Sequence, residues 1–201
     1  RIDPVQAASA RGQGETTANA SIAGAAGVTG ISNLAVQCVC QNDNMCVGGG
    51  LPAGLGCGTD HCCSERPVVE SVTPPDGSSG ACRNALMTAQ FSTAMDASTF
   101  TAQTVRLDIA PDAGVCPVGV LRNGWCEGAA EIRLSSRNIV EVIGERAIQK
   151  TILQISPREA LRASKRYRVN LSGGAVGIKS GSVVAMGADY IWTFITGADI
   201  C

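Results

Sequence analysis

From Pro67 onward, short runs of alternating apolar and polar residues are separated by turn residues. In the run NALMTAQFS, for example, Ala85, Met87, Ala89 and Phe91 fall on one face of an extended strand. Similar runs occupy residues 67–74, 105–109, 131–135, 138–143, 147–155, 166–172 and 190–196. Strands with a single apolar face bury that face against a second sheet, so this part of the chain is predicted to be a β-sandwich.

Two segments precede the predicted sandwich. Residues 1–37 form a Gly/Ala-rich extension without sustained helical or strand periodicity, and residues 38–66 contain six of the ten cysteines. We therefore expect three parts: the extension 1–37, a disulfide-stapled segment 38–66 and a sandwich over 67–201. A short helical turn is also expected at residues 157–164, because Pro157 suits the first helical position.

The composition argues against two kinds of partner. The net charge is −1 and the basic residues are dispersed, whereas nucleic-acid binding requires clustered positive charge. The uncharged stretch 16–42 is too rich in Gly, Ser, Thr and Asn for a membrane span. Because the sequence begins at Arg1 rather than Met, we expect a processed product or a fragment, from which a signal peptide would already be gone.

A family resemblance supports the sandwich and refines it. The stretches VVESVTPPDGSSG, FSTAMDAST, ISPREALRASKRYRVNLSGG and YIWTFITG resemble the bacterial Ig-like domain of S-layer and other exported surface proteins, over about residues 66–197. The residues that carry the resemblance are Pro74, Gly77, Phe91, Ser92, Met95, Asp96, Ser98, Thr99, Pro157, Leu161, Tyr167, Trp192, Thr193 and Phe194. It implies an all-β, Ig-like, extracellular module with a structural or adhesive role, and the insertion at 111–130 departs from its simplest pattern.

The same residues also have simple structural interpretations. By alternation, Phe91, Tyr167 and Trp192 are expected in the core, and Met95 at the edge of the sandwich. Asp96, followed by Ser98 and Thr99, is expected to cap a turn, because short oxygen-bearing side chains accept hydrogen bonds from free backbone N–H groups.

The cysteines allow two interpretations. The sequence CGTDHCC, residues 57–63, places the single histidine, His61, among three cysteines, and a Cys3His zinc site can be drawn there. Cys38 and Cys40 are too close for the usual zinc knuckle, however, and an even set of six forms three bridges without remainder: Cys38, Cys40, Cys46, Cys57, Cys62 and Cys63. We therefore predict disulfides, no structural metal and no cofactor, while fifteen pairings of the six remain open.

Four cysteines lie within the sandwich. The Ig-like strand order implies that the last strand ends where the second begins, so Cys82 and Cys201 are expected to form a bridge. Cys116 and Cys126 remain in the inserted segment. A two-residue turn at Asn123-Gly124 would place Cys126 opposite Leu121 rather than Cys116, which weakens a local bridge without excluding it.

The sequence favours a structural protein over an enzyme. It has one histidine and contains no nucleophile elbow, P-loop or dinucleotide fingerprint. The alternative is an adhesin-type module that binds a glycan or is stabilised by calcium. Its candidate residues are Trp125 for a sugar and Asn42, Asp43, Asn44 and Asp112 for a cation.

The expected partners are copies of the chain itself or tandem Ig-like neighbours, on the cell surface or outside the cell. Residues 1–37 carry too little apolar surface to offset their ordering entropy alone. We expect them to add a strand to a neighbouring copy, which head to tail would give a filament. Folding back on their own domain, or belonging to a preceding Ig-like copy, are the alternatives.

Overall fold

The computed structural model describes residues 18–20, 32–34, 40–41, 43–46, 55–57, 63–128 and 130–201. The chain divides into two compact units. The first comprises residues 1–66 together with Ser182–Val184, and the second comprises Pro67–Gly181 and Ala185–Cys201.

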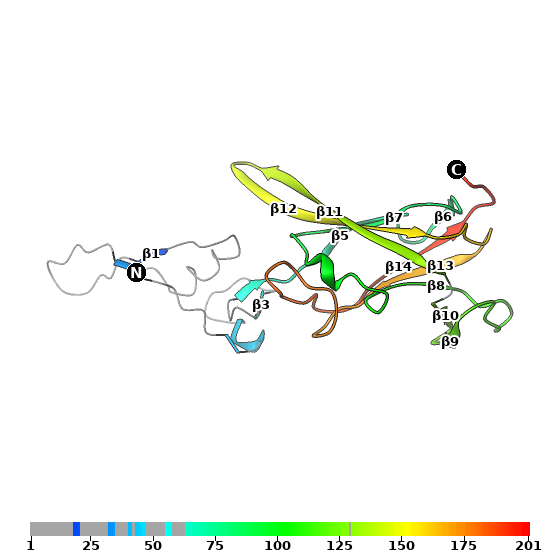
Figure 1. Ribbon diagram of the computed structural model, residues 1–201, viewed down its shortest axis with the longest axis horizontal. Helices are drawn as coiled ribbons and strands as arrows, with labels where there is room; N and C mark the ends of the chain where they lie inside the picture. Colours follow the sequence, from blue (N-terminus) through cyan, green and yellow to red (C-terminus); the bar gives the residue numbers. More distant parts are fainter. Residues whose placement is uncertain are drawn as a thin grey trace. The chain divides into compact units, whose positions relative to one another are not determined.

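The second unit is the predicted β-sandwich (Figure 1). One sheet has the strand order β6-β14-β13-β8-β10-β9, and the other has the order β11-β12-β7-β5. The strands of the first sheet are β6 (Ser78–Ala81), β8 (Val105–Ile109), β9 (Val120–Arg122), β10 (Trp125–Glu127), β13 (Arg166–Leu171) and β14 (Tyr190–Thr196). Those of the second are β5 (Val69–Thr73), β7 (Met87–Phe91), β11 (Ile132–Ile143) and β12 (Arg146–Pro157).

The core consists of the alternating residues that point between the two sheets. Met87, Ala89 and Phe91 of β7 are fully buried, as the spacing of two predicts. From the facing sheet, Val169, Trp192 and Phe194 join the same cluster, together with Val105, Leu107, Ile109, Tyr167 and Leu171. The period-two pattern thus correctly predicted both the architecture and the core.

Two sequence-based expectations about strands and helices were wrong. The runs 131–135 and 138–143 are one continuous strand, β11, which pairs with β12 from Ile132↔Pro157 to Ile143↔Arg146. Residues 157–164 contain no helix. Instead, this segment bonds to residues outside the strands: Arg158 N donates to Glu131 O, just before β11, at 2.9 Å, and Leu161 N donates to Arg83 O, between β6 and β7, at 2.7 Å.

One strand of the sandwich, β6, has no alternating apolar pattern in its sequence. β6 follows the turn at Pro75-Asp76-Gly77 and has the sequence SSGA, without apolar alternation. It pairs in parallel with β14, with Ser78 opposite Phe194 and Ala81 opposite Thr196. The extended conformation of SSGA therefore depends on pairing with β14 rather than on its own composition.

The first unit has little regular structure among its described residues. Two short antiparallel pairs are present, β1 (Ala18–Ala20) with β2 (Ser32–Leu34), and β3 (Leu55–Cys57) with β4 (Cys63–Glu65). A 3₁₀ turn, η2 (Asp43–Cys46), precedes β3. No helix in the described part of the chain is long and apolar enough to cross a membrane.

Candidate functional site

Cysteines dominate the small apolar cluster in the described part of the first unit. Cys40 is bonded to Cys57, and Cys46 to Cys63, with Cα–Cα distances of 5.7 and 5.5 Å. Cys40, Cys46 and Leu55 are buried, and the half-buried Cys57 and Cys63 pack against them. The cysteines thus provide the cross-links and four of the five side chains of this cluster.

The metal alternative involves the same sulfur atoms. The Sγ atoms of Cys40, Cys46 and Cys57 lie within 4.8 Å of one another, close enough for a shared ion. Each of the three is already in a disulfide, however, and zinc binds the thiolate form. A zinc site on these sulfurs would therefore require reduction of both bridges. His61, Cys38 and Cys62 lie outside the described residues.

In the sandwich, a bridge joins Cys82 to Cys201, with the Cα atoms 5.7 Å apart. This is the pair that the Ig-like strand order implies. Asn84 supports it from both directions, because its Nδ2 donates to Cys201 O at 2.8 Å and its Oδ1 accepts from Cys201 N at 3.1 Å. Arg83 N also donates to Asp199 O at 2.9 Å. The bridge and these bonds hold the end of the chain against the segment after β6.

The inserted segment contains the fourth described bridge, Cys116 to Cys126. Asn123 and Gly124 form the predicted two-residue turn, with φ angles of 49° and 77°, and Cys126 lies opposite Leu121 as that turn requires. Cys116 reaches Cys126 because the chain before β9 folds back. The turn at Asn123-Gly124 and the pairing of Cys126 with Leu121 are therefore as expected. The Cys116–Cys126 bridge forms as well, although Cys116 lies outside the paired residues of β9 and β10.

A polar cluster attaches this insertion to the sheet. The fully buried Asp108 on β8 accepts from Arg168 Nε and Nη2 at 3.0 and 2.6 Å, and from Gly128 N at 3.3 Å. The Arg168 guanidinium also lies 4.8 Å from the centroid of the Trp125 ring, and 4.0 Å from Glu127. A buried carboxylate with these three donors is compensated, so the cluster stabilises the fold rather than offering a free acid or base.

Two candidate binding residues, Trp125 and Asp112, already have partners within the sandwich. Trp125 is half-buried beneath Arg168, so its ring is not a free platform for a sugar. Asp112 accepts a hydrogen bond from Lys165 Nζ and lies 3.6 Å from Arg162 Nη1. Asn42 lies outside the described residues, and Asp43 and Asn44 belong to η2.

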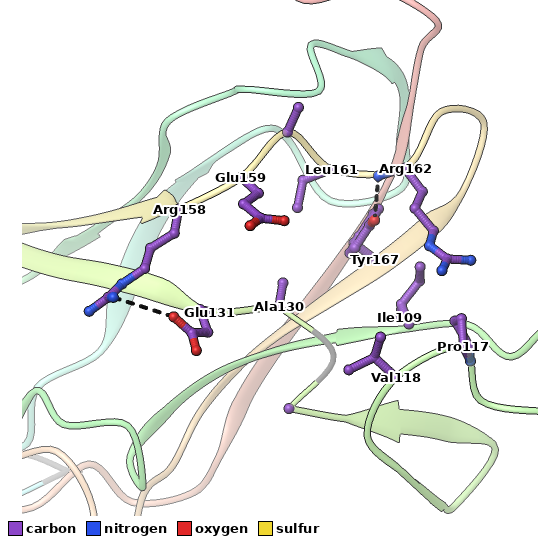
Figure 2. A pocket seen from close by; sticks show the side chains of 12 residues that line it. Ile109, Pro117, Val118, Ala130, Glu131, Arg158, Glu159, Leu161, Arg162 and Tyr167 are labelled. Carbon is purple, nitrogen blue, oxygen red and sulfur yellow. Dashed lines mark hydrogen bonds and ion pairs between the residues drawn. The ribbon is translucent and has the colours of Figure 1, made fainter.

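A pocket of about 710 Å³ opens between the insertion and the segment after β12 (Figure 2). Its lining includes Glu131 and Arg158, which form an exposed ion pair at 3.4 Å. The Tyr167 hydroxyl accepts from Arg162 N at 2.8 Å, and burial raises the pKa of this phenol. No serine, threonine, cysteine or histidine is among its described lining residues, so the pocket offers no activated nucleophile of those types.

The most concentrated charge on the second sheet surrounds Lys150. This residue is only 6% exposed and contacts two carboxylates, Glu141 and Glu70, the latter at 2.7 Å. Hydrogen bonds to Glu141 and then to Glu70 raise the pKa of the Lys150 ammonium. Single-residue patterns in the sequence did not predict this cluster, because it joins β5, β11 and β12.

Asp96 forms the predicted cap. Its Oδ1 accepts from Ser98 Oγ at 2.7 Å and from Ser98 N at 2.9 Å, at the start of the 3₁₀ turn η3 (Ala97–Thr99). These two bonds lower the pKa of the Asp96 carboxyl, with the side-chain bond as the larger cause. Met95 is 7% exposed, in accord with its expected place in the sandwich.

Comparison with known proteins gives the family. The family model described as bacterial Ig-like domain matches residues 64–196. The chain belongs to the bacterial Ig-like domain family. This match covers both sheets of the sandwich, and the resemblance inferred from the sequence motifs is thereby confirmed.

Solved structures with similarity to this Ig-like chain include bacterial surface-layer proteins. The N-terminal part of the bacterial S-layer protein SbsC aligns at 17% identity and a TM-score of 0.36, over 66% of this chain and 24% of that one. Domains 1–6 of the surface layer protein SbsC align at 17% identity and a TM-score of 0.36, over 66% and 14%. This chain thus spans a quarter or less of the length of those proteins. The search of curated proteins gave no match.

Proposed function

We propose that this Ig-like chain is a non-catalytic structural module of a bacterial surface protein or extracellular filament. Family membership gives the fold, and the disulfides indicate the compartment. Four bridges lie among the described residues, and such a density persists in oxidising environments rather than in a reducing cytosol. That chemistry supports an exported, extracellular location.

The observation that carries the structural role is the Cys82–Cys201 bridge. It closes a loop with a sequence separation of 119, which contains most of the sandwich. A force applied between Pro67 and residue 201 follows the backbone to Cys82 and then crosses the sulfur–sulfur bond. The core strands β7 to β14 lie inside the closed loop and are not extended. A module with this covalent path transmits tension without extending strands β7 to β14.

Assembly is proposed to use the N-terminal extension, residues 1–37. Such a Gly/Ala-rich segment can pair through main-chain hydrogen bonds, which do not require large side chains. Acceptor edges exist in the described sandwich, because β5 ends one sheet and β6 ends the other. A donor at one end and an acceptor on the sandwich would give a head-to-tail contact that does not close.

The experiment compares the full chain with a variant that lacks residues 1–37, by light scattering over a range of concentrations. The full chain is expected to form species that grow with concentration, because each added copy offers a new free end. The truncated variant should keep the sandwich circular dichroism spectrum and lose this growth. Unchanged growth after truncation would show that the extension is not the connector.

A further inference from the structure

The edge strand β11 is long, and one of its two sides has no strand partner in the described part of the chain. All twelve of its residues pair with β12, and no other strand of the described chain pairs with it. One row of its backbone N–H and C=O groups therefore has no strand partner in the described part of the molecule. Natural sheets protect such edges or use them to bind another chain.

The hairpin of β11 and β12 also extends beyond its own sheet (Figure 1). β12 pairs with β7 only over Ile152–Ile155, whereas its ladder with β11 continues to Arg146. On this outer part, Val140 is 62% exposed and Val142 is 69% exposed. Two valines in this state mark a surface that another chain could cover.

The charges along β11 are arranged symmetrically about Ile139. Arg137 precedes it by two residues and Glu141 follows it by two; Arg133 precedes it by six, and the turn residue Glu145 follows by six. In a strand, Arg133, Arg137, Ile139 and Glu141 share one side of the sheet. The first half of this side is basic and the second half is acidic.

This pattern is self-complementary in an antiparallel pair. We propose that β11 pairs with β11 of a second copy about a two-fold axis at Ile139, which makes a continuous sheet of eight strands. Arg137 of each copy then lies opposite Glu141 of the other, and Arg133 comes level with the turn that carries Glu145. On the opposite side, Val140 lies across from Asn138 of the second copy, and Val142 across from Ser136. Ile139 meets itself at the axis.

The charges also select this register against its neighbours. A shift of the axis to residue 137 would place the two Arg137 side chains opposite each other, and a shift to residue 141 would do the same for Glu141. Like charges directly opposite each other destabilise a strand pair, while opposite charges stabilise it. Parallel pairing in register would also bring arginine to arginine. The antiparallel register at Ile139 is the one in which the charges match.

The required charges are available in the described structure. Arg133 and Arg137 are exposed, and in the part of the chain that the structure describes neither forms an ion pair. Glu141 lies beside Lys150 together with Glu70, so two carboxylates share one ammonium. This leaves one net negative charge, which Arg137 of the second copy would balance.

Such a contact is isologous and closes at two copies, so it is separate from the head-to-tail contact proposed for residues 1–37. It can be tested in the full chain with two charge reversals, Arg137→Glu and Glu141→Arg, each measured alone and in an equimolar mixture. Sedimentation velocity reports the size of the assemblies. Any contribution of residues 1–37 is common to every sample, so differences between samples belong to β11.

The wild-type chain is expected to form the two-copy contact. Each single variant places two like-charge pairs in the interface and should bind itself about tenfold more weakly, or worse. The mixture should recover wild-type association. Arg137→Glu carries glutamate at positions 137 and 141, and Glu141→Arg carries arginine at both, so every pair in the mixed dimer joins opposite charges. A mixture that associates no better than its two components would overturn the proposal, as would variants that associate like the wild type.

Three further variants, one pair and one control, test whether the result belongs to β11. The pair Arg133→Glu and Glu145→Arg repeats the design without touching Lys150, in case Glu141→Arg disturbs the hairpin. Arg122→Glu is the matched control, because Arg122 is exposed on β9, the edge strand of the other sheet. Loss of association in Arg122→Glu equal to that in Arg137→Glu would point to net charge rather than to β11, and would also overturn the proposal.

Discussion

The two units of this chain are stabilised in different ways. In the described part of the first unit, the apolar cluster consists of four cysteines and Leu55, and two bridges join the cysteines. In the sandwich, large apolar residues such as Phe91, Trp192 and Phe194 fill most of the core. Of its two bridges, Cys82–Cys201 is partly exposed, whereas Cys116–Cys126 contributes the buried Cys126 to that core. A segment too short to bury much apolar surface depends on covalent cross-links, whereas a sandwich of this size can rely on packing.

The largest expected effect comes from the bridge that closes the sandwich. Replacing both Cys82 and Cys201 by alanine should lower the free energy of unfolding by up to about 5 kcal/mol, because the bridge removes entropy from a long unfolded loop. Urea denaturation measures the difference. The matched control replaces Cys116 and Cys126, which close a loop with a separation of 10, and should cost roughly half as much. Equal losses in the two variants would contradict the loop-length argument.

Next in size is a substitution in the packed core. Phe91→Ala removes a fully buried ring and should cost about 3–5 kcal/mol in the unfolding of the sandwich. The bridges of the first unit, observed by mass spectrometry under native conditions, should persist in this variant. Their loss would mean that the two units do not have separate sources of stability.

Removal of a first-unit bridge should show the reverse pattern. Replacing Cys40 and Cys57, whose separation is 17, should destabilise the first unit by about 3 kcal/mol. Hydrogen exchange of the backbone is expected to increase at residues 40–65 and to stay unchanged in β7, β13 and β14. Increased exchange throughout the sandwich core would contradict the comparison between the units.

The smallest effect concerns pH. The raised pKa of Lys150 means that the folded protein binds this proton more tightly than the unfolded chain does. Its contribution to stability is therefore complete below the unfolded lysine pKa, at about pH 10, and is lost as the pH rises through the raised value. The difference in Tm between wild type and Lys150→Met should be constant from about pH 6 to 9 and should shrink above about pH 10. A Tm difference that grows at alkaline pH would show that folding lowers, rather than raises, the pKa of Lys150.

Much of the sandwich could be predicted from the sequence because its signals are local. Alternation alone places Met87, Val105 and Trp192 in the core, and Asn123-Gly124 fixes the β9–β10 turn. Strands and strand ends that depend on a distant partner strand could not be predicted. β6 exists through its pairing with β14, and Pro157 ends a strand because Ile132 pairs with it.

The same limit applies to the interaction surface. Arg137 and Glu141 look like ordinary surface charges until the continuous length and edge position of β11 are known. The six cysteines of residues 38–66 likewise indicate bridges by their number and spacing, while only three-dimensional proximity selects Cys40–Cys57 and Cys46–Cys63.

The central claim is that the cysteines serve as structural cross-links, and peptide mapping of the unreduced chain by mass spectrometry tests it most directly. The account predicts peptides linked through Cys40–Cys57, Cys46–Cys63, Cys82–Cys201 and Cys116–Cys126. Since the sequence has ten cysteines, the intact chain should be lighter by ten hydrogens than its reduced form. Free thiols in the first unit that take up zinc stoichiometrically would contradict it.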